Sequence, residues 1–225
     1  SNTTTITASD NYGYSLSLSC SAPSGLSCSI SPTTVSSGGS ATVNISVSPT
    51  TNGGNYTITI TASDTVTGYS YSTSITVSVP QETFSISSNP NSLTIIPGKS
   101  NTTTITASDN YGYSLSLSCS NLPSGWSCNF NPSTINSGSS STLTISVPSS
   151  YYSGGTYNVT IVATDTVTGQ TNSTNITVII PSESISVSAS SSSLTIIPGK
   201  SNTTTITASD NYGYSLSLSC SAPSG

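Results

Sequence analysis

Apolar and polar residues alternate with a period of two along most of this chain. In residues 16–20, 43–47, 56–62 and 75–79, apolar side chains take every second position, and uncharged polar side chains take the others. Successive side chains of a β-strand point to opposite faces, so this pattern predicts strands with one buried face. No stretch shows the 3.6-residue period of a helix. The sequence therefore predicts an all-β fold.

Short turn motifs separate the predicted strands. Asn-Tyr-Gly lies at 11–13, Pro-Ser-Gly at 23–25 and Gly-Gly at 53–54, and these are residues that tight turns favour. About seven strands fit into each stretch of roughly 100 residues, which is typical of a two-sheet antiparallel sandwich. We expect tandem sandwiches in which one face of each sheet is buried.

Long internal repeats organise the chain. The string SNTTTITASDNYGYSLSLSCS occurs at 1–21, 100–120 and 201–221, and residues 1–25 are identical to residues 201–225. The stretch SLTIIPGK precedes the second and third copies. Self-similarity at a fixed period is the signature of a repeat architecture. We expect the chain to be a window on a longer periodic object, either a tandem polypeptide or a filament of equivalent subunits.

The repeats also predict domain boundaries. Residues 1–80 form a sandwich that lacks its first strand in this sequence, 81–181 form a complete sandwich, and 182–225 supply the first strands of a further repeat. The first sandwich has no counterpart of residues 84–96, so its sheet edge is open. Because unpaired edges invite association, we expect preceding residues or a strand from a neighbouring subunit to cover it.

The complete unit carries a series of recognisable segments. In order they are TFSISSNPNSLTIIPGK, TTTITA, SLSLSCSNLPSGWSCNFNPSTI, STLTISV, GTYNVTIVATD and TNITVII. Across essentially all of the unit, this series resembles the immunoglobulin-like repeats found in tandem in bacterial and archaeal secreted surface proteins. The resemblance implies an immunoglobulin-like β-sandwich that serves as a spacer, stalk or adhesive module. The cysteine pair departs from the usual pattern of that family.

Composition excludes several function classes. The chain has two Lys and Arg residues together, seven Asp and Glu residues and no His, and 4% of its residues are charged. Two basic residues cannot build a nucleic-acid surface, and without His the usual general base and the commonest zinc ligand are missing. No run is long enough to span a membrane. We expect a protein that is not an enzyme and has no nucleic-acid partner.

The cysteines are paired in the sequence. Cys20 and Cys28 flank one Pro-Ser-Gly turn, Cys119 and Cys128 flank another, and Cys220 has no partner. We expect each pair to form a disulfide that closes the corner, with metal binding or free thiols as the alternatives. Disulfides indicate an oxidising, extracellular compartment.

Asparagine occurs repeatedly in acceptor motifs for N-glycosylation. The motif Asn-x-Ser/Thr begins at Asn2, Asn44, Asn55, Asn101, Asn158, Asn172, Asn175 and Asn202. Several of these residues lie between inward-facing apolar positions, so their side chains point to solvent. We expect dense N-glycosylation, and the alternative is an ordinary polar surface. Covalent N-glycans are the only non-protein groups expected, and no cofactor is predicted.

Aspartates recur at fixed places. Asp10, Asp109 and Asp210 precede Asn-Tyr-Gly, and Asp64 and Asp165 each follow a predicted strand. Aspartate at such a position normally caps a turn by accepting bonds from nearby backbone amides. A calcium site is the alternative, but calcium requires more oxygen ligands than each aspartate supplies. The sequence therefore predicts turn caps and no metal site.

The lysines and aromatic residues have structural interpretations. Lys99 and Lys200 follow Pro-Gly and are expected in exposed loops, with an isopeptide crosslink as the alternative. Tyr56 and Tyr157 resemble the corner tyrosine of sandwich domains, whose hydroxyl bonds to the main chain. Trp126 is expected in the core. Packing is the expected role of the other tyrosines, and a sugar-binding strip is the alternative for Tyr12, Tyr14, Tyr69 and Tyr71.

These expectations combine into a structural function. We expect a repeat unit of an extracellular, N-glycosylated filament at the cell surface, a pilus, thread or stalk, whose partners are identical repeats in a homopolymer. The architecture and composition also resemble the thread-like, donor-strand-linked pili of thermoacidophilic archaea, and few titratable groups suit a hot, acidic exterior. The alternatives are an adhesin that binds surface glycans or other cells, and a spacer in a larger secreted enzyme.

Overall fold

The structure is a computed structural model that describes residues 2–151 and 153–222. These residues form eighteen strands and no helix, so the prediction of an all-β fold is confirmed. In the described part of the chain, no helix is long and apolar enough to cross a membrane. The strands are β1 (Asn2–Ala8), β2 (Leu16–Ser21), β3 (Leu26–Ser31), β4 (Thr34–Val35), β5 (Gly39–Val47), β6 (Gly54–Asp64), β7 (Ser70–Val79), β8 (Phe84–Asn89), β9 (Ser92–Thr94), β10 (Ser100–Asp109), β11 (Ser114–Ser120), β12 (Ser127–Asn131), β13 (Thr134–Asn136), β14 (Ser140–Ser146), β15 (Gly155–Asp165), β16 (Thr171–Ile180), β17 (Ile185–Ala189) and β18 (Ile206–Asp210).

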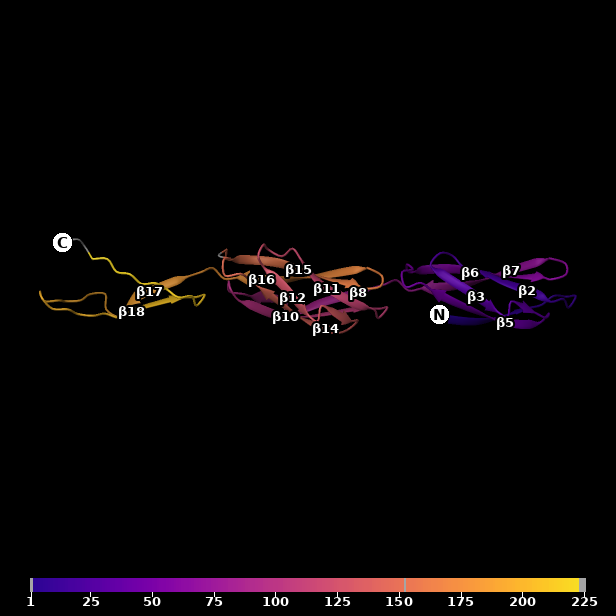
Figure 1. Cartoon of the computed structure of the whole chain (residues 1–225), viewed down its shortest axis with the longest axis horizontal. Coiled ribbons are helices and arrows are strands. Elements are labelled where there is room, and N and C mark those ends of the chain that lie inside the picture. Colours follow the sequence, from indigo (N-terminus) through magenta and orange to yellow (C-terminus); the bar gives the residue numbers. More distant parts are fainter. Residues whose placement is uncertain (1, 152, 223–225) are drawn as a thin grey trace. The chain divides into compact units, whose positions relative to one another are not determined.

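The first sandwich consists of two sheets (Figure 1). One sheet has the strand order β1-β5-β3 and the other has the order β4-β2-β6-β7. The alternation in the sequence is an alternation of burial: Leu16 and Leu18 in β2, and Ile58 and Ile60 in β6, are buried. The Ser and Thr residues between them are exposed. Each such apolar side chain contributes about 1.5–3 kcal/mol when it is fully buried.

The second sandwich is built on the same plan with more strands. One sheet has the order β12-β14-β10-β8, and the other has the order β13-β11-β15-β16-β9. Side chains from both sheets fill the space between them, and Ile105, Leu115, Leu143 and Ile161 are fully buried. The predicted tandem β-sandwiches are therefore present.

The first strand of the second sandwich divides between the two sheets. β8 pairs with β10, and after Pro90 the chain crosses over so that β9 pairs with β16 in the other sheet. Proline has no N–H to donate to a strand ladder, which favours a break at this point. β9 runs parallel to β16, with Leu93 opposite Val178. The prediction of about seven antiparallel strands missed this parallel segment and the three-residue strand β13.

The last part of the chain forms a small two-stranded sheet. β17 and β18 are antiparallel, with Val187 opposite Ala208. Ile185, Val187 and Ile197 in this part are more than half exposed. A two-stranded sheet without a covered apolar face is marginally stable in water.

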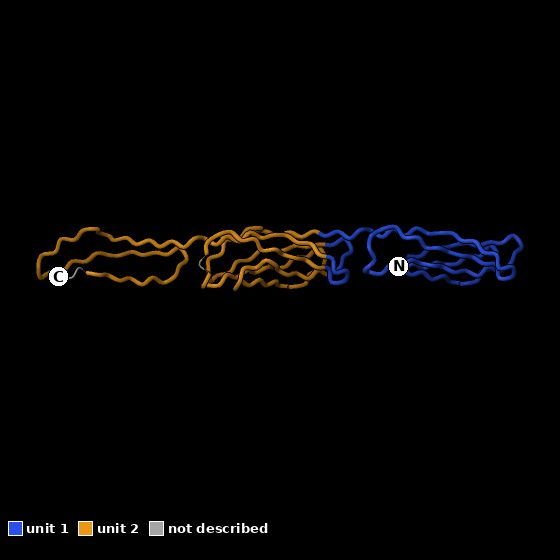
Figure 2. Tube along the Cα trace, turned by 90° about the horizontal axis from the view of Figure 1, so that it is seen from above, with its two compact units in different colours: residues 1–84, 109–113, 165–170 blue, residues 85–108, 114–164, 171–225 orange. Residues whose placement is uncertain are grey.

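Compactness divides the chain into two units (Figure 2). The first unit contains residues 1–84, 109–113 and 165–170, and the second contains 85–108, 114–164 and 171–225. The sheets are distributed differently, because the strands of each sheet lie within residues 2–79, 84–180 or 185–210. The domain boundaries expected from the repeats remain a prediction.

Each sandwich has a disulfide between its two sheets. Cys20 in β2 is joined to Cys28 in β3, and Cys119 in β11 is joined to Cys128 in β12. The Cα atoms of these pairs are 6.2 and 6.5 Å apart. In both sandwiches the two strands belong to different sheets. The bond therefore fixes the corner at which the chain leaves one sheet for the other, while Cys220 is free and exposed.

Removal of the second disulfide should destabilise the second sandwich. For the double substitution Cys119→Ala and Cys128→Ala, we expect the free energy of unfolding to fall by about 2–3 kcal/mol, because the unfolded chain regains the entropy of a short loop. Trp126 lies inside that loop, is buried and is the one tryptophan of the chain. Its fluorescence in a urea titration therefore reports on this sandwich alone. The variant Cys220→Ala is the control, and equal urea midpoints for all three proteins would contradict the account.

Candidate functional site

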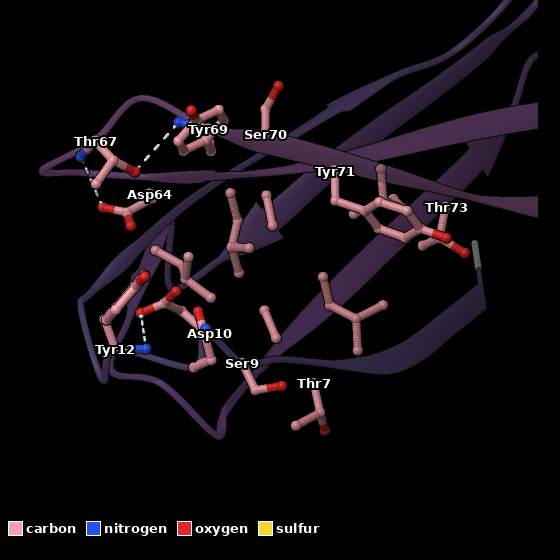
Figure 3. A pocket seen from close by; sticks show the side chains of 17 residues that line it. Thr7, Ser9, Asp10, Tyr12, Asp64, Thr67, Tyr69, Ser70, Tyr71 and Thr73 are labelled. Atoms are coloured by element: carbon pink, nitrogen blue, oxygen red, sulfur yellow. Dashed lines mark hydrogen bonds between the residues drawn. The ribbon is translucent and has the colours of Figure 1, made fainter.

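A groove runs along the first sandwich between β1 and β7. Two cavities form it, with volumes of about 680 Å³ and 450 Å³. The larger cavity is lined by residues of β1, β2, β6 and β7 and by the turn at 9–12, and the smaller one by residues of β1, β5 and β7. Asp10 and Asp64 lie at one end of the larger cavity, and Tyr71 and Thr73 lie at the other (Figure 3). We call the two cavities together the strand groove.

Identical sequences show what the strand groove lacks. Residues 1–10 and 100–109 have the same sequence, but β1 is an edge strand, whereas β10 lies between β14 and β8. Thr103 is buried and its hydroxyl donates to the carbonyl oxygen of Pro90 at 2.5 Å, while the equivalent Thr4 is exposed. Ile105 is fully buried, while the equivalent Ile6 is half-buried. The difference follows from the presence of β8 beside β10.

The two sandwiches differ in the same way on the other side of the strand groove, where a covered position in the second sandwich corresponds to an exposed one in the first. In the second sandwich, Leu93 and Ile95 are buried, and the Ile95 amide donates to the carbonyl oxygen of Ile179 in β16. The Gly98 amide donates to the carbonyl oxygen of Val147, whose own amide donates to the carbonyl oxygen of Lys99. Val147 is 2% exposed. The equivalent Val47 of the first sandwich is 39% exposed and lines the smaller cavity. The strand groove is therefore the place that residues 84–99 occupy in the complete sandwich.

The aspartates cap turns, as the sequence predicts. Asp165 Oδ1 accepts hydrogen bonds from the amides of Val167 and Thr168, at 2.6 and 2.9 Å. Asp109 accepts one bond on each oxygen, from the amides of Tyr111 and Tyr113. These bonds hold the carboxylates at the ends of β15 and β10.

Asp64 shows the electrostatic consequence of capping. Burial alone raises the pKa of this carboxyl, but hydrogen bonds from the Val66 amide and from the amide and hydroxyl of Thr67 together lower it. The charged form is therefore favoured in the folded chain, and its contribution to stability is lost as the pH falls through the lowered pKa.

The Asn-Tyr-Gly turn at 110–112 holds the segment that precedes β8. Asn110 donates from Nδ2 to the carbonyl oxygen of Gln81 at 3.0 Å and accepts from the Thr83 amide at 2.8 Å. The Tyr111 hydroxyl donates to the carbonyl oxygen of Pro80 at 2.5 Å. Three bonds thus fix the backbone on both sides of Glu82.

This arrangement brings three carboxylates together in one compact unit. One oxygen from each of Glu82, Asp109 and Asp165 lies within 4.8 Å of the others. Asp109 is 6% exposed and Asp165 is 1% exposed. We call these residues the acidic triad. The sequence analysis identified both aspartates but not Glu82, which is far from either in the sequence.

Glu82 is electrostatically unfavourable in this position. Burial raises the pKa of its carboxyl, and the hydrogen bond from the Thr168 hydroxyl opposes that effect. The charges of Asp165 and Asp109 raise the pKa further, as does a hydrogen bond between the protonated carboxyl and Asp165. The folded chain therefore holds this proton more tightly than the unfolded chain does. The free energy of unfolding consequently falls as the pH rises from the ordinary glutamate pKa to the raised one.

The same contacts recur around Glu183. Asn211 donates to the carbonyl oxygen of Ser182 at 2.9 Å and accepts from the Ser184 amide at 2.8 Å. The Tyr212 hydroxyl donates to the carbonyl oxygen of Pro181, and this tyrosine is buried. Burial raises the pKa of Tyr212, and the charges of Glu183 and Asp210 are among the other causes. The turn motif therefore holds a glutamate-bearing segment twice in this chain.

The predicted glycosylation residues all lie on the surface. The side chains of Asn2, Asn44, Asn55, Asn101, Asn158, Asn172, Asn175 and Asn202 are exposed. The amide groups of two of them, Asn101 and Asn202, donate to the carbonyl oxygens of Thr94 and Thr195 at 3.2 and 3.5 Å. The positions are accessible to a modifying enzyme, and the modification itself remains a prediction.

The corner tyrosines and Trp126 behave as the sequence predicts. The hydroxyls of Tyr56 and Tyr157 donate to the carbonyl oxygens of Asn52 and Ser153, four residues upstream. Trp126 is buried with its ring edge-on to those of Tyr151 and Tyr157.

Both lysines and the tyrosines at positions 12, 14, 69 and 71 lie on the surface. Both lysines, Lys99 and Lys200, are exposed, which disfavours the isopeptide alternative. Tyr12, Tyr69 and Tyr71 are strongly exposed and line the larger cavity of the strand groove. Tyr14 is also exposed, at 38%. None of the four packs in the core, so of the expected packing roles only a place at the rim remains for them. Tyr12 differs in this from its equivalents Tyr111 and Tyr212, whose hydroxyls donate to the carbonyl oxygens of Pro80 and Pro181 in the segments that precede β8 and β17.

No protein-family model and no curated protein matches the chain. Several solved structures are similar in part, including the following three. Domains 4 and 5 of the S-layer protein SbsC are 14% identical, over 60% of this chain and 69% of that one, with a TM-score of 0.35. A protein of unknown function from Porphyromonas gingivalis W83 is 13% identical, over 80% and 92%, with a TM-score of 0.30. The S-layer protein rSbsC(31-844) is 13% identical, over 87% of this chain and 28% of its own length, with a TM-score of 0.36.

Proposed function

We propose that this chain is a structural repeat of an extracellular, N-glycosylated cell-surface filament in which neighbouring copies share strands. The strand groove is the observation that carries this proposal. The first sandwich has two sheets, a disulfide and a core, but the place of its first strand is filled by no described residue. The complete sandwich indicates what fits there, namely a segment with the sequence pattern of residues 82–99.

The chain contains a second segment of this kind. Residues 193–201 repeat residues 92–100 without change, and Ile185 and Val187 occupy the places of Phe84 and Ile86. Leu194, Ile196 and Ile197 are 38%, 49% and 70% exposed, whereas Leu93 and Ile95 are buried. Burial of such side chains contributes about 1.5–3 kcal/mol each. The segment 183–198 of a second copy is therefore the proposed occupant.

Transfer of this segment between copies keeps its hydrogen bonds. β17 pairs with β18 in its own chain, and residues 201–210 have the same sequence as residues 1–10. In the same register, β1 of a second copy offers β17 the same backbone partners, with Val187 opposite Ala8. β1 is backed by a core that β18 lacks, since Ile6 packs against Leu16 and Leu18. Exchange thus adds apolar burial at little cost in backbone pairing.

Surface chemistry supports an extracellular location. Two disulfides connect the sheets, and such bonds persist in oxidising compartments. The outward faces carry Ser, Thr and Asn in place of charge, and eight acceptor motifs are exposed. Glycans on these residues would supply the solubility that charged side chains usually give.

Strand sharing predicts concentration-dependent end-to-end association of the 225-residue chain. In sedimentation velocity and electron microscopy, the chain should form linear oligomers, and a peptide of residues 182–199 should shorten them. Val187→Asp should weaken association by at least about tenfold, because it buries an unpaired charge in the strand groove. The matched control is Val66→Asp, which changes an exposed valine on the β6–β7 turn.

Two results would contradict strand sharing between copies. One is a chain that stays monomeric at high concentration, and the other is equal association of Val187→Asp and the unaltered protein. A denaturing gel of the native filament then separates two forms of linkage. A band near one 200-residue unit indicates separate subunits, whereas a very large chain indicates that neighbouring repeats are joined covalently.

Glycosylation is tested on protein from its native source. Mass spectrometry of peptides that contain Asn44, Asn55, Asn158 or Asn175 should show a glycan mass, which an amidase that removes N-glycans converts to aspartate. These four residues alternate with inward-facing apolar residues on long strands. Unmodified peptides at all four would contradict the glycoprotein proposal and leave an ordinary polar surface.

A further inference from the structure

The carboxylates of this chain are concentrated at one kind of place. All seven acidic residues belong to three equivalent sets, which are Asp10 with Asp64, Glu82 with Asp109 and Asp165, and Glu183 with Asp210. The middle set contains all three members and is the acidic triad. The first set lacks its glutamate, and the last contains the glutamate and the first aspartate. A chain that is 4% charged thus places all of its negative side chains at equivalent positions of the repeat.

No protein cation compensates the acidic triad. The two basic residues are Lys99 and Lys200, and both are exposed. Lys99 immediately precedes β10 and Asp109 ends it, so the extended strand separates the two by about 30 Å. Three carboxylates within 4.8 Å, two of them buried, repel one another strongly when they are ionised.

One oxygen of the acidic triad has no hydrogen-bond partner. Asp165 is 1% exposed, and its Oδ1 is used by the amides of Val167 and Thr168. Its Oδ2 is buried and unpaired among the described residues. An unpaired buried carboxylate oxygen is costly, and among the described residues Glu82 can donate to Asp165 only when its carboxyl is protonated. A cation is the ligand that this oxygen and its neighbours suit.

We propose that Glu82, Asp109 and Asp165 bind a calcium ion. Two oxygens on opposite sides of Ca²⁺ are about 5 Å apart, because each Ca–O bond is about 2.3–2.6 Å long. The 4.8 Å span of the acidic triad fits that diameter. Calcium accepts monodentate or bidentate carboxylates and completes its shell of six to eight oxygens with water. Magnesium has shorter bonds and usually takes one or two carboxylates.

The ion would lock the segment that leads into the first strand. Glu82 lies between Gln81 and Thr83, which Asn110 holds through its side chain. Calcium would tie this segment to the ends of β10 and β15, because Asp109 and Asp165 are the last residues of those strands. The site lies within one chain, so the inference does not depend on strand sharing.

The test uses the full chain after treatment with a chelator. Strand sharing would place Glu183 of a second copy near Asp10 and Asp64, so the titration uses the Val187→Asp chain, which should stay monomeric. Titration of this chain with CaCl₂ in a calorimeter should give one site per chain with a Kd of about 10⁻⁴–10⁻³ M, the range of extracellular calcium modules. Calcium should also raise the thermal unfolding temperature, and MgCl₂ at the same concentration should raise it less. Glu82→Gln should weaken calcium binding by more than about tenfold, since it removes one charged ligand but no turn cap.

The controls separate calcium binding from folding and from assembly. In the same Val187→Asp chain, Asp64→Asn alters the equivalent turn cap in the set without a glutamate, and it should leave calcium binding unchanged. Asp165→Asn should abolish binding, and its circular dichroism shows whether the sandwich is intact. The unaltered chain should bind calcium at the acidic triad whether or not it associates, so that failure of strand sharing is distinguishable. Absence of calcium binding at about 10 mM, an equal effect of magnesium, or an unchanged Kd in Glu82→Gln would overturn the proposal.

Discussion

A β-sandwich keeps its core dry only when a strand covers the open edge between its two sheets. This constraint explains the main contrasts within the chain. Thr103 and Ile105 are buried beneath the first strand of their sandwich, while Thr4 and Ile6, in an identical sequence, are partly or fully exposed. The end of the same segment bonds to Val147 in the second sandwich, where Val147 is buried. The first sandwich has no such segment, and the equivalent Val47 is exposed. The requirement for this one segment connects the fold to the proposed assembly.

Two further features stabilise the sandwich around its first strand. A disulfide fixes the corner where the chain passes from one sheet to the other, and the Asn-Tyr-Gly turn holds the backbone that leads into the first strand. Uncharged Ser and Thr residues cover the outward faces. Negative charge is confined to the turns and to the segments that lead into the first strands. The chain therefore has few charges overall, and those that are negative are concentrated at these turns and segments.

Much of this could be predicted from local patterns. The alternation of residues 16–20 and 56–62 gave the buried faces, and the spacing of Cys119 and Cys128 around a turn indicated their bond. Turn capping by Asp165 is also a local property. In contrast, the parallel pairing of β9 with β16 and the approach of Glu82 to the aspartates depend on contacts between distant residues. The recurrence of all seven carboxylates at equivalent positions was the one sequence signal that could have indicated the acidic triad.

Cysteine crosslinking tests strand sharing most directly. In the second sandwich the hydroxyls of Ser85 and Ser108 are 2.6 Å apart, and the equivalent pair across two copies is Ser186 and Ser9. Chains with Ser186→Cys and chains with Ser9→Cys, both with Cys220→Ala, would be mixed and mildly oxidised. The account predicts a disulfide between the two different chains. A yield no higher than that of Ser186→Cys mixed with Ser72→Cys, an exposed position on β7, would contradict it.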